Sequence, residues 1–261
     1  MARLDCVLAA RGIAPSRSSA KEMILSGAVT VNGKVVKKPS AEVSESDAVE
    51  SSVQQIYVGR GALKLEKAAE EFDLSFKSKV CLDIGASTGG FTDFMLRNGA
   101  ARVYAVDVGS DQLAESLRSD SRVVSMEKTD IRNITADDLG GCVDFICTDV
   151  SFISLKMILP KIYELLKDGE TAAVLIKPQF EAGKSNIGKH GIVKDQKVHV
   201  NVLADTDRFS AELGLVPEGF CCSPIKGGSG NIEYLMKVRK NTGNRIVCDF
   251  KELVSDSFKK L

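Results

Sequence analysis

The sequence predicts an α/β protein in which a Rossmann-like domain follows a small basic unit. After residue 58, apolar strands alternate with helical stretches to about residue 240, which is typical of α/β domains. The segment VCLDIGASTGGF, residues 80–91, runs from an apolar strand into a glycine turn, where such folds bind ligands. Residues 1–38 differ, because they hold seven basic and only two acidic residues.

The overall composition argues against a uniformly basic nucleic-acid-binding protein, a metalloprotein and a membrane protein. With 35 basic and 35 acidic residues among 261, any affinity for nucleic acid must come from local patches. Seven cysteines without a CxxC pair, beside only His190 and His199, lead us to expect no metal site. Their odd number indicates reduced, mostly buried thiols. Because there is no signal peptide and no apolar run of about 18 residues, we expect a cytoplasmic protein that does not contact membranes.

The amino-terminal unit is expected to hold two short helices and a hairpin. The first helix lies in ARLDCVLAARG and ends at Gly12, and the second lies in APSRSSAKEMILSG and ends at Gly27. Asn32-Gly33 in AVTVNGKVV predicts a hairpin with a type I′ turn. Residues 39–58, rich in serine and acids, indicate a closing strand and a linker. We therefore divide the chain into residues 1–58 and 59–261.

The glycine turn at residues 85–90 has three candidate ligands. A phosphate-binding P-loop needs GxxxxGK[ST], but the one GKS in the chain, at residues 183–185, has Pro178 where the first glycine must stand. A dinucleotide turn needs GxGxxG, and Ser87 replaces the middle glycine between Gly85 and Gly90. The third candidate is S-adenosylmethionine in a Rossmann-like methyltransferase.

The acids around the turn favour S-adenosylmethionine. Asp83 would repel a pyrophosphate, yet it can hold the cationic amino-acid end of this cofactor. Asp107, which ends the next strand, can bind both ribose hydroxyls, although NAD needs such an acid too. Asp130 can accept from the adenine amino group, with the backbone of Ile131 beside it. Each acid alone could be a helix N-cap. The predicted cofactor site comprises Asp83, Gly85, Ser87, Gly89, Gly90, Phe91, Asp107, Asp130 and Ile131.

Charged residues end several of the predicted strands. Asp83, Asp107, Asp149 and Lys177 each close an apolar run, so they converge on the carboxyl edge of the sheet. Such convergence is costly unless the charges have partners or a function. Lys64 and Glu233 extend the group to a possible K-D-K-E set. Lys64 could instead lie on the solvated face of a helix, and Glu233 could be an exposed position of an alternating strand.

Several segments of this sequence resemble two known protein families. The pattern of residues 3–50 resembles the RNA-binding domain named for ribosomal protein S-four, the α-L fold. The stretches LDIGASTGGFTD, TDVSFISL, IKPQFE and GNIEYL are similar to FtsJ-like ribose 2′-O-methyltransferases, although Ser87-Thr88 stand where those enzymes often have proline. Together they resemble the TlyA (haemolysin A) family of rRNA cytidine-2′-O-methyltransferases. The implied fold is a Rossmann-like S-adenosylmethionine-dependent methyltransferase domain behind a small RNA-binding domain.

This resemblance implies roles for individual residues. Lys64, Asp149, Lys177 and Glu233 would be catalytic, with Lys177 either a base or a cation that stabilises an alkoxide. The partner would be rRNA or a ribosomal subunit. Apart from the resemblance, the glycines and lysines of residues 180–195 predict a mobile loop suited to closing over RNA, with an ordinary solvated loop as the alternative. The RNA contacts that the resemblance implies are Arg3, Arg17, Lys21, and Lys37 or Lys38. The loop adds Lys184 and Lys189 as candidate contacts.

The resemblance also bears on which RNA is modified, and two other functions compete with methylation. The first helix starts almost at Met1, as in the shorter TlyA-like proteins, which implies a single target in large-subunit rRNA. One alternative is a non-catalytic RNA-binding protein, against which the intact K-D-K-E set argues. A second is a membrane-damaging haemolysin, which is disfavoured because no export signal or membrane segment is evident. The sequence does not indicate an oligomeric state.

Overall fold

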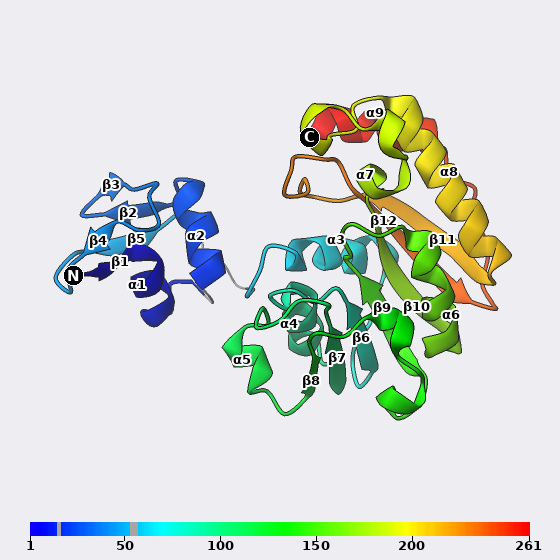
Figure 1. Ribbon diagram of the computed structural model, residues 1–261, viewed down its shortest axis with the longest axis horizontal. Helices are drawn as coiled ribbons and strands as arrows, with labels where there is room; N and C mark the ends of the chain where they lie inside the picture. Colours follow the sequence, from blue (N-terminus) through cyan, green and yellow to red (C-terminus); the bar gives the residue numbers. More distant parts are fainter. Residues whose placement is uncertain (15–16, 53–56) are drawn as a thin grey trace.

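The computed structural model describes residues 1–14, 17–52 and 57–261, without the side chains of Ser18 and Lys189. A small amino-terminal unit lies beside a larger α/β unit (Figure 1). The α/β class and the basic amino-terminal unit are confirmed.

The amino-terminal unit packs two helices on short strands. β3, β2 and β5 form one antiparallel sheet in that order, and β1 pairs with β4. The predicted hairpin is confirmed, since Asn32 and Gly33 connect β2 to β3 with φ of 51° and 75°, as a type I′ turn requires. Leu4, Leu8 and Ile24 are fully buried in its core. Its elements are β1 (Ala2–Arg3), α1 (Leu4–Ala10), α2 (Arg17–Leu25), β2 (Val29–Val31), β3 (Lys34–Val35), β4 (Glu42–Val43) and β5 (Val49–Ser51).

A seven-stranded sheet forms the centre of the larger unit, in the order β11-β12-β10-β9-β6-β7-β8. The five strands from β10 to β8 are parallel, whereas β12 is antiparallel to both of its neighbours. The carboxyl ends of the parallel strands therefore meet the amino end of β12 at one edge. The strands are β6 (Val80–Ile84), β7 (Arg102–Val106), β8 (Val123–Met126), β9 (Val143–Thr148), β10 (Leu166–Ile176), β11 (Leu215–Cys222) and β12 (Tyr234–Lys240).

Helices cover both faces of this sheet. Alternate strand residues point to opposite faces, so that Phe145 and Ile146 lie in two different buried clusters. The cluster with Phe145 includes residues of α3, α4 and α5, and the cluster with Ile146 includes residues of α6, α8 and α9. The helices are α3 (Ala62–Phe72), α4 (Gly90–Arg97), α5 (Glu115–Arg118), α6 (Leu159–Leu165), α7 (Pro178–Glu181), α8 (Gln196–Glu212) and α9 (Phe250–Lys260). Single 3-10 turns are η1 (Ile131–Asn133), η2 (Asp137–Leu139), η3 (Leu155–Met157), η4 (Lys184–Asn186) and η5 (Lys189–Gly191).

The segment just before α3 packs with the larger unit. The backbone N–H of Val58 donates to Oδ2 of Asp93 at 2.9 Å, and the ring of Tyr57 lies 5.7 Å from that of Phe94. A division of the chain between residues 58 and 59 remains a prediction, and these contacts favour placing a cut before Tyr57.

The cysteines differ from the expectation of mostly buried thiols. All seven are free, and Cys81, Cys147 and Cys221 are buried. The other four are only partly buried: Cys6, Cys142, Cys222 and Cys248. Cys222 is the last residue of β11, and Cys142 and Cys248 lie in loops.

Candidate active site

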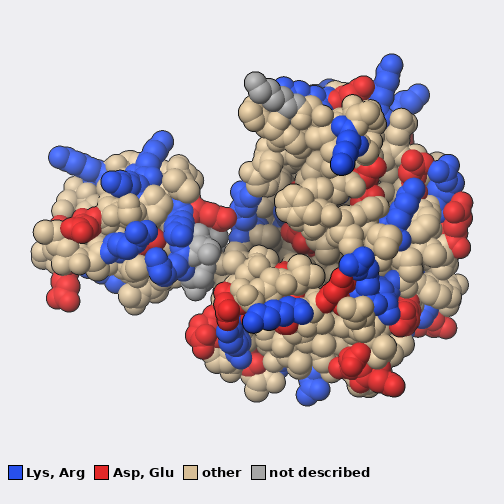
Figure 2. Space-filling model, viewed as in Figure 1, with Lys and Arg blue, Asp and Glu red and all other residues tan. Residues whose placement is uncertain are grey.

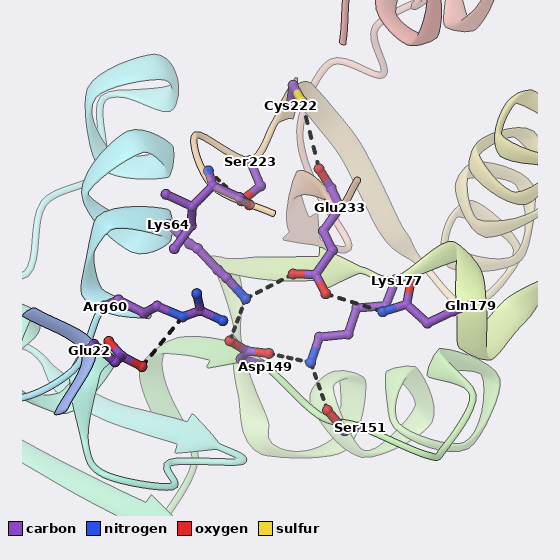
Figure 3. Close-up of polar contacts among 11 residues, drawn as sticks. Glu22, Arg60, Lys64, Asp149, Ser151, Lys177, Gln179, Cys222, Ser223 and Glu233 are labelled. Carbon is purple, nitrogen blue, oxygen red and sulfur yellow. Dashed lines mark hydrogen bonds and ion pairs between the residues drawn. The ribbon is translucent and has the colours of Figure 1, made fainter. Parts of the chain in front are cut away.

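Two lysines and two acids form an ion-pair network at the carboxyl edge of the sheet (Figure 3). Lys64 of α3 donates from Nζ to Oδ2 of Asp149 at 3.0 Å and to Oε2 of Glu233 at 2.9 Å. Nζ of Lys177 lies 2.6 Å from Oδ1 of Asp149. Asp149 directly follows β9, Lys177 follows β10, and Glu233 precedes β12. The predicted convergence of Asp149 and Lys177 on this edge is confirmed, and Lys64 and Glu233 join them as the possible K-D-K-E set.

The network is largely buried. Lys64 and Lys177 are each 7% exposed, and Glu233 is 2% exposed. A solvated position for Lys64 and an exposed one for Glu233 are therefore both wrong. The physical reason is that β12 runs antiparallel to β10 and so enters the sheet at the carboxyl edge, where Glu233 meets the lysine of α3. Buried charges persist only when they are paired, as these are.

Lys64 and Asp149 stay ionised at neutral pH. Burial by itself lowers the pKa of Lys64, but the charges of Asp149 and Glu233 and their hydrogen bonds outweigh burial and raise this pKa above its usual value. Burial likewise raises the pKa of Asp149, and the two lysine charges outweigh it, so that the pKa of Asp149 is lowered. Two positive and two negative groups leave the network with no net charge.

Two polar side chains complete the network. Nζ of Lys177 donates to Oγ of Ser151 at 2.9 Å, and Nε2 of Gln179 donates to Oε1 of Glu233 at 3.2 Å. Sequence reasoning missed both residues. Each stands two positions after a strand-end charge, Ser151 after Asp149 and Gln179 after Lys177, and that spacing could have indicated them.

A cavity of about 420 Å³ opens on the network. The glycine turn lines one side of it, and the segments around Arg60 and Gly228 line another. Phe152 lies at its border and is 92% exposed, with a φ of +64° that bulky residues rarely adopt. Its ring is 5.1 Å from that of Phe180. An exposed, strained aromatic beside charged groups indicates a binding surface, and sequence reasoning missed it.

The glycine turn leaves no space for larger residues. Gly85 has a φ of +84°, and a Cβ there would lie 2.7 Å from the carbonyl oxygen of Asp149. At Gly89 a Cβ would lie 2.3 Å from Leu117, and at Gly90 it would lie 2.9 Å from the backbone of Ala62. Gly89 therefore serves close packing against α5, and Gly90 packs against the start of α3. Gly85 and Gly90 both line the cavity.

A second cavity of about 460 Å³ adjoins the first, and Gly85 and Asp149 line both. Asp107 stabilises the wall of this second cavity. Its Oδ2 accepts from the backbone N–H of Ser87 at 2.8 Å, and its Oδ1 accepts from the backbone N–H of Gly109 at 2.7 Å. The remaining lining is largely apolar: Val106, Val108, Ile131, Val150, Ile153 and Ile158. A carboxylate beside apolar walls suits a nucleoside, with ribose at the acid and the base between apolar side chains.

Asp83 and Asp130 have structural partners of their own. Asp83 is fully buried and accepts from Oγ1 of Thr92 at 2.7 Å, and burial raises its pKa to about 7. Asp130 caps η1 by accepting from the N–H of Arg132 at 2.9 Å, and hydrogen bonds from Arg132 lower its pKa. Phe91 is 4% exposed and packs mainly in the core. Cofactor roles for these three residues stay predictions.

The predicted RNA contacts lie mostly on the surface of the amino-terminal unit, where Figure 2 shows many basic side chains. Lys21, Lys37 and Lys38 are exposed. Arg3 and Arg17 lie 2.9 Å and 3.4 Å from the buried carboxylate of Asp5. In the other unit, Lys184 is exposed at the start of η4, and the side chain of Lys189 lies outside the described residues. In the described part of the chain, no three His, Cys, Asp or Glu side chains group as metal ligands.

Comparison with known proteins adds independent information. The FtsJ-like methyltransferase family model matches residues 57–240, and the S4 domain model matches residues 2–49. The 16S/23S rRNA (cytidine-2′-O)-methyltransferase TlyA of Mycobacterium tuberculosis is 42% identical over 243 residues, which is 92% of this chain and 91% of that protein. The 23S rRNA (cytidine-2′-O)-methyltransferase TlyA of Campylobacter jejuni is 37% identical over 246 residues, or 87% and 95%.

A solved structure is similar over both units. This protein from Streptococcus thermophilus, which carries a hemolysin name, superimposes with a TM-score of 0.81 and 41% identity. The match covers 99% of this chain and 96% of that one, so both units have counterparts there.

Proposed function

We propose that this chain, which belongs to the FtsJ-like methyltransferase family and carries an S4 domain, methylates the ribose 2′-hydroxyl of a cytidine in ribosomal RNA. The observation that carries the proposal is the buried network of Lys64, Asp149, Lys177 and Glu233, which opens on a cavity beside the glycine turn. The two TlyA relatives are named for this reaction, and most of each is covered by this chain.

The cavity lining fits S-adenosylmethionine as the methyl donor. The close approach of Gly85 to the backbone of Asp149 leaves an open turn where a side chain would intrude. Asp107 would hold the ribose hydroxyls, Ile131 and Asp130 the adenine, and Asp83 the amino-acid end, with Ser87, Gly89, Gly90 and Phe91 forming the turn. When bound, this cofactor supplies a methyl group activated by its sulfonium charge.

Lys177 is the group that we place at the ribose hydroxyl. Its ammonium is held by Asp149 and Ser151 at the cavity, where it can stabilise the negative charge that develops on the 2′-oxygen. The ion pair of its Nζ with Oδ1 of Asp149 at 2.6 Å and the hydrogen bond to Ser151 fix this group as a cation at the cavity wall. We therefore assign it the electrostatic role. Lys64 and Glu233 hold Asp149 and the lysines in this arrangement.

The substrate that we propose is large-subunit rRNA. Both relatives named as TlyA carry 23S rRNA in their names, and one carries 16S rRNA as well. The S4 domain would bind rRNA through phosphate contacts of Arg3, Arg17, Lys21, Lys37 and Lys38. A location in the cytoplasm, where ribosomes are modified, follows as a prediction.

Nucleoside analysis tests this function directly. Large ribosomal subunits from cells that lack the gene are incubated with the purified protein and S-adenosylmethionine, and their nucleosides are analysed by mass spectrometry. We expect 2′-O-methylcytidine in 23S rRNA after incubation with the wild-type protein. Methylation of another nucleoside, or of none, would overturn the proposal.

The two alternatives are testable beside it. A non-catalytic RNA-binding protein would bind subunits without adding methyl groups, and the intact network argues against it. In the part of the chain that the structure describes, no helix is long and apolar enough to cross a membrane. Leakage of dye from phosphatidylcholine vesicles at micromolar protein would nevertheless support a haemolytic activity.

A further inference from the structure

One arginine lines the cavity without joining the ion-pair network. Arg60 stands four residues before Lys64, and Figure 3 shows its guanidinium beside the lysine side chain. Gly59 and Gly61 flank it, and a Cβ at Gly59 would lie 2.6 Å from Oγ1 of Thr88. The backbone that carries Arg60 is thus packed against the glycine turn. The arginine side chain, in contrast, is 46% exposed.

The charge of Arg60 is available to a ligand. Its ion-pair partner in the described part of the chain is Glu22 of α2, at 3.7 Å, and the side chains are 46% and 47% exposed. An ion pair this long and this exposed contributes little to stability. Glu22 nevertheless lines the same cavity, so a carboxylate of the amino-terminal unit stands at the entrance to the active site.

A cation at this wall would attract the polyanionic substrate. RNA brings a phosphate on either side of the target ribose, and the ion-pair network has no net charge with which to attract it. A guanidinium at the cavity wall supplies that charge and binds phosphate oxygens in pairs. A Cβ at Gly228 would lie 3.7 Å from Nη2 of Arg60, so the glycine-rich segment 227–230 passes next to the guanidinium.

We propose that Arg60 binds a backbone phosphate of the substrate RNA next to the target ribose, and that this phosphate replaces the carboxylate of Glu22. The inference rests on the proposed function, because the phosphate belongs to the RNA that is methylated. Arg17 and Lys21 lie on the same helix as Glu22, so binding of α2 to RNA brings phosphates to the place where Glu22 pairs with Arg60. The amino-terminal unit and the active site thereby bind the same RNA strand.

Steady-state methylation of large subunits by a set of variants tests this inference. We expect Arg60→Gln to raise the KM for subunits about tenfold and to lower the slope of log affinity against log salt by about 1, with unchanged affinity for S-adenosylmethionine. Glu22→Gln should lower the KM severalfold. In the Arg60→Gln background, the Glu22→Gln change should have no effect, because the two residues act on one contact.

Matched controls separate this contact from general charge effects. Glu50→Gln removes an exposed acid from the same unit, and Arg102→Gln removes an exposed arginine at the opposite edge of the sheet. Both should leave the KM within about twofold of the wild type, as surface changes away from a binding site do. If the wild type methylates subunits and Arg60→Gln has an unchanged KM, the inference is wrong while the proposed function stands. If the wild type adds no methyl group, the proposed function itself is wrong, and the inference that rests on it is wrong as well.

Discussion

Nζ of Lys64 lies 3.0 Å from Oδ2 of Asp149, although 85 residues separate them in the chain. The lysine comes from α3 on one face of the sheet, and the acid comes from the carboxyl end of β9. This contact joins the segment that follows the amino-terminal unit to the centre of the sheet. It also places a cation and an anion side by side at the wall of the cavity, where the substrate ribose is proposed to bind.

Replacement of Lys177 by alanine should abolish methyl transfer. Loss of a positioned ammonium that stabilises transition-state charge costs about 10²–10³-fold in kcat. Affinity for S-adenosylmethionine, measured by calorimetry, should stay close to the wild type, since the residue acts on the hydroxyl. Lys167→Ala is the matched control, because Lys167 lies at the other end of β10. Wild-type turnover in Lys177→Ala would remove this residue from the mechanism.

Replacement of Asp107 by alanine should weaken binding of S-adenosylmethionine by about 10–100-fold. Two effects combine, removal of the ribose contact and removal of the hydrogen bonds to Ser87 and Gly109 that organise the turn. The melting temperature should fall only slightly, since the residue follows β7 outside the core. Asp205→Ala, at an exposed position of α8, serves as the control for surface charge. Tight binding of NAD instead would contradict the cofactor assignment.

Asp83 should make stability fall as pH rises. Burial raises its pKa from 3.8 to about 7, so the native state binds a proton that the unfolded state releases between these values. Ionising Asp83 in the native state lowers the free energy of unfolding. This loss is absent below pH 3.8 and complete above about pH 7, where it reaches up to about 4 kcal/mol. Asp83→Asn keeps an acceptor for Thr92. Denaturant titrations should show its stability advantage growing from about pH 4 to about pH 7, and a constant difference would refute the raised pKa of this buried acid.

Removal of the Phe152 side chain should weaken RNA binding without destabilising the protein. An exposed ring stacks on nucleobases at about 1–3 kcal/mol per base, so Phe152→Ala should raise the KM for subunits about tenfold. Phe152→Gly should also raise the melting temperature, because glycine adopts a φ of +64° without strain. Val247→Ala, which truncates another fully exposed apolar residue, is the control and should not change the KM. An unchanged KM in Phe152→Ala would leave the exposed ring without a function.

Deletion of residues 1–52 should leave a folded domain that binds S-adenosylmethionine. The amino-terminal core is a separate buried cluster, and the cut spares the packing of Tyr57 and Val58 with the larger unit. Affinity for large subunits should fall at least about tenfold, and the salt slope should fall by about 1 for each phosphate contact that the deletion removes. Gel-shift titrations at two salt concentrations measure both. Undiminished RNA binding would assign the amino-terminal unit another role.

Much of the fold followed from local patterns in the sequence. The alternation of strands and helices, the Asn32-Gly33 turn and the glycine turn after β6 depend on residues within a few positions of one another. Parallel strands place their carboxyl ends at one edge, so the positions of Asp149 and Lys177 at strand ends were enough to predict that they meet. The separate basic unit was likewise evident from its charge alone.

The tertiary structure decided which of these charges are buried and what they touch. Lys64 and Glu233, 169 residues apart, meet only because β12 inserts antiparallel beside β10. The contact of Arg60 with Glu22 depends on how the amino-terminal unit and the larger unit pack together. Local spacing carries no information on such long-range contacts, since each is set by the register of strands and the packing of faces far apart in the chain. For this protein the sequence determined the chemistry available at the sheet edge, and the packing of distant elements decided its arrangement.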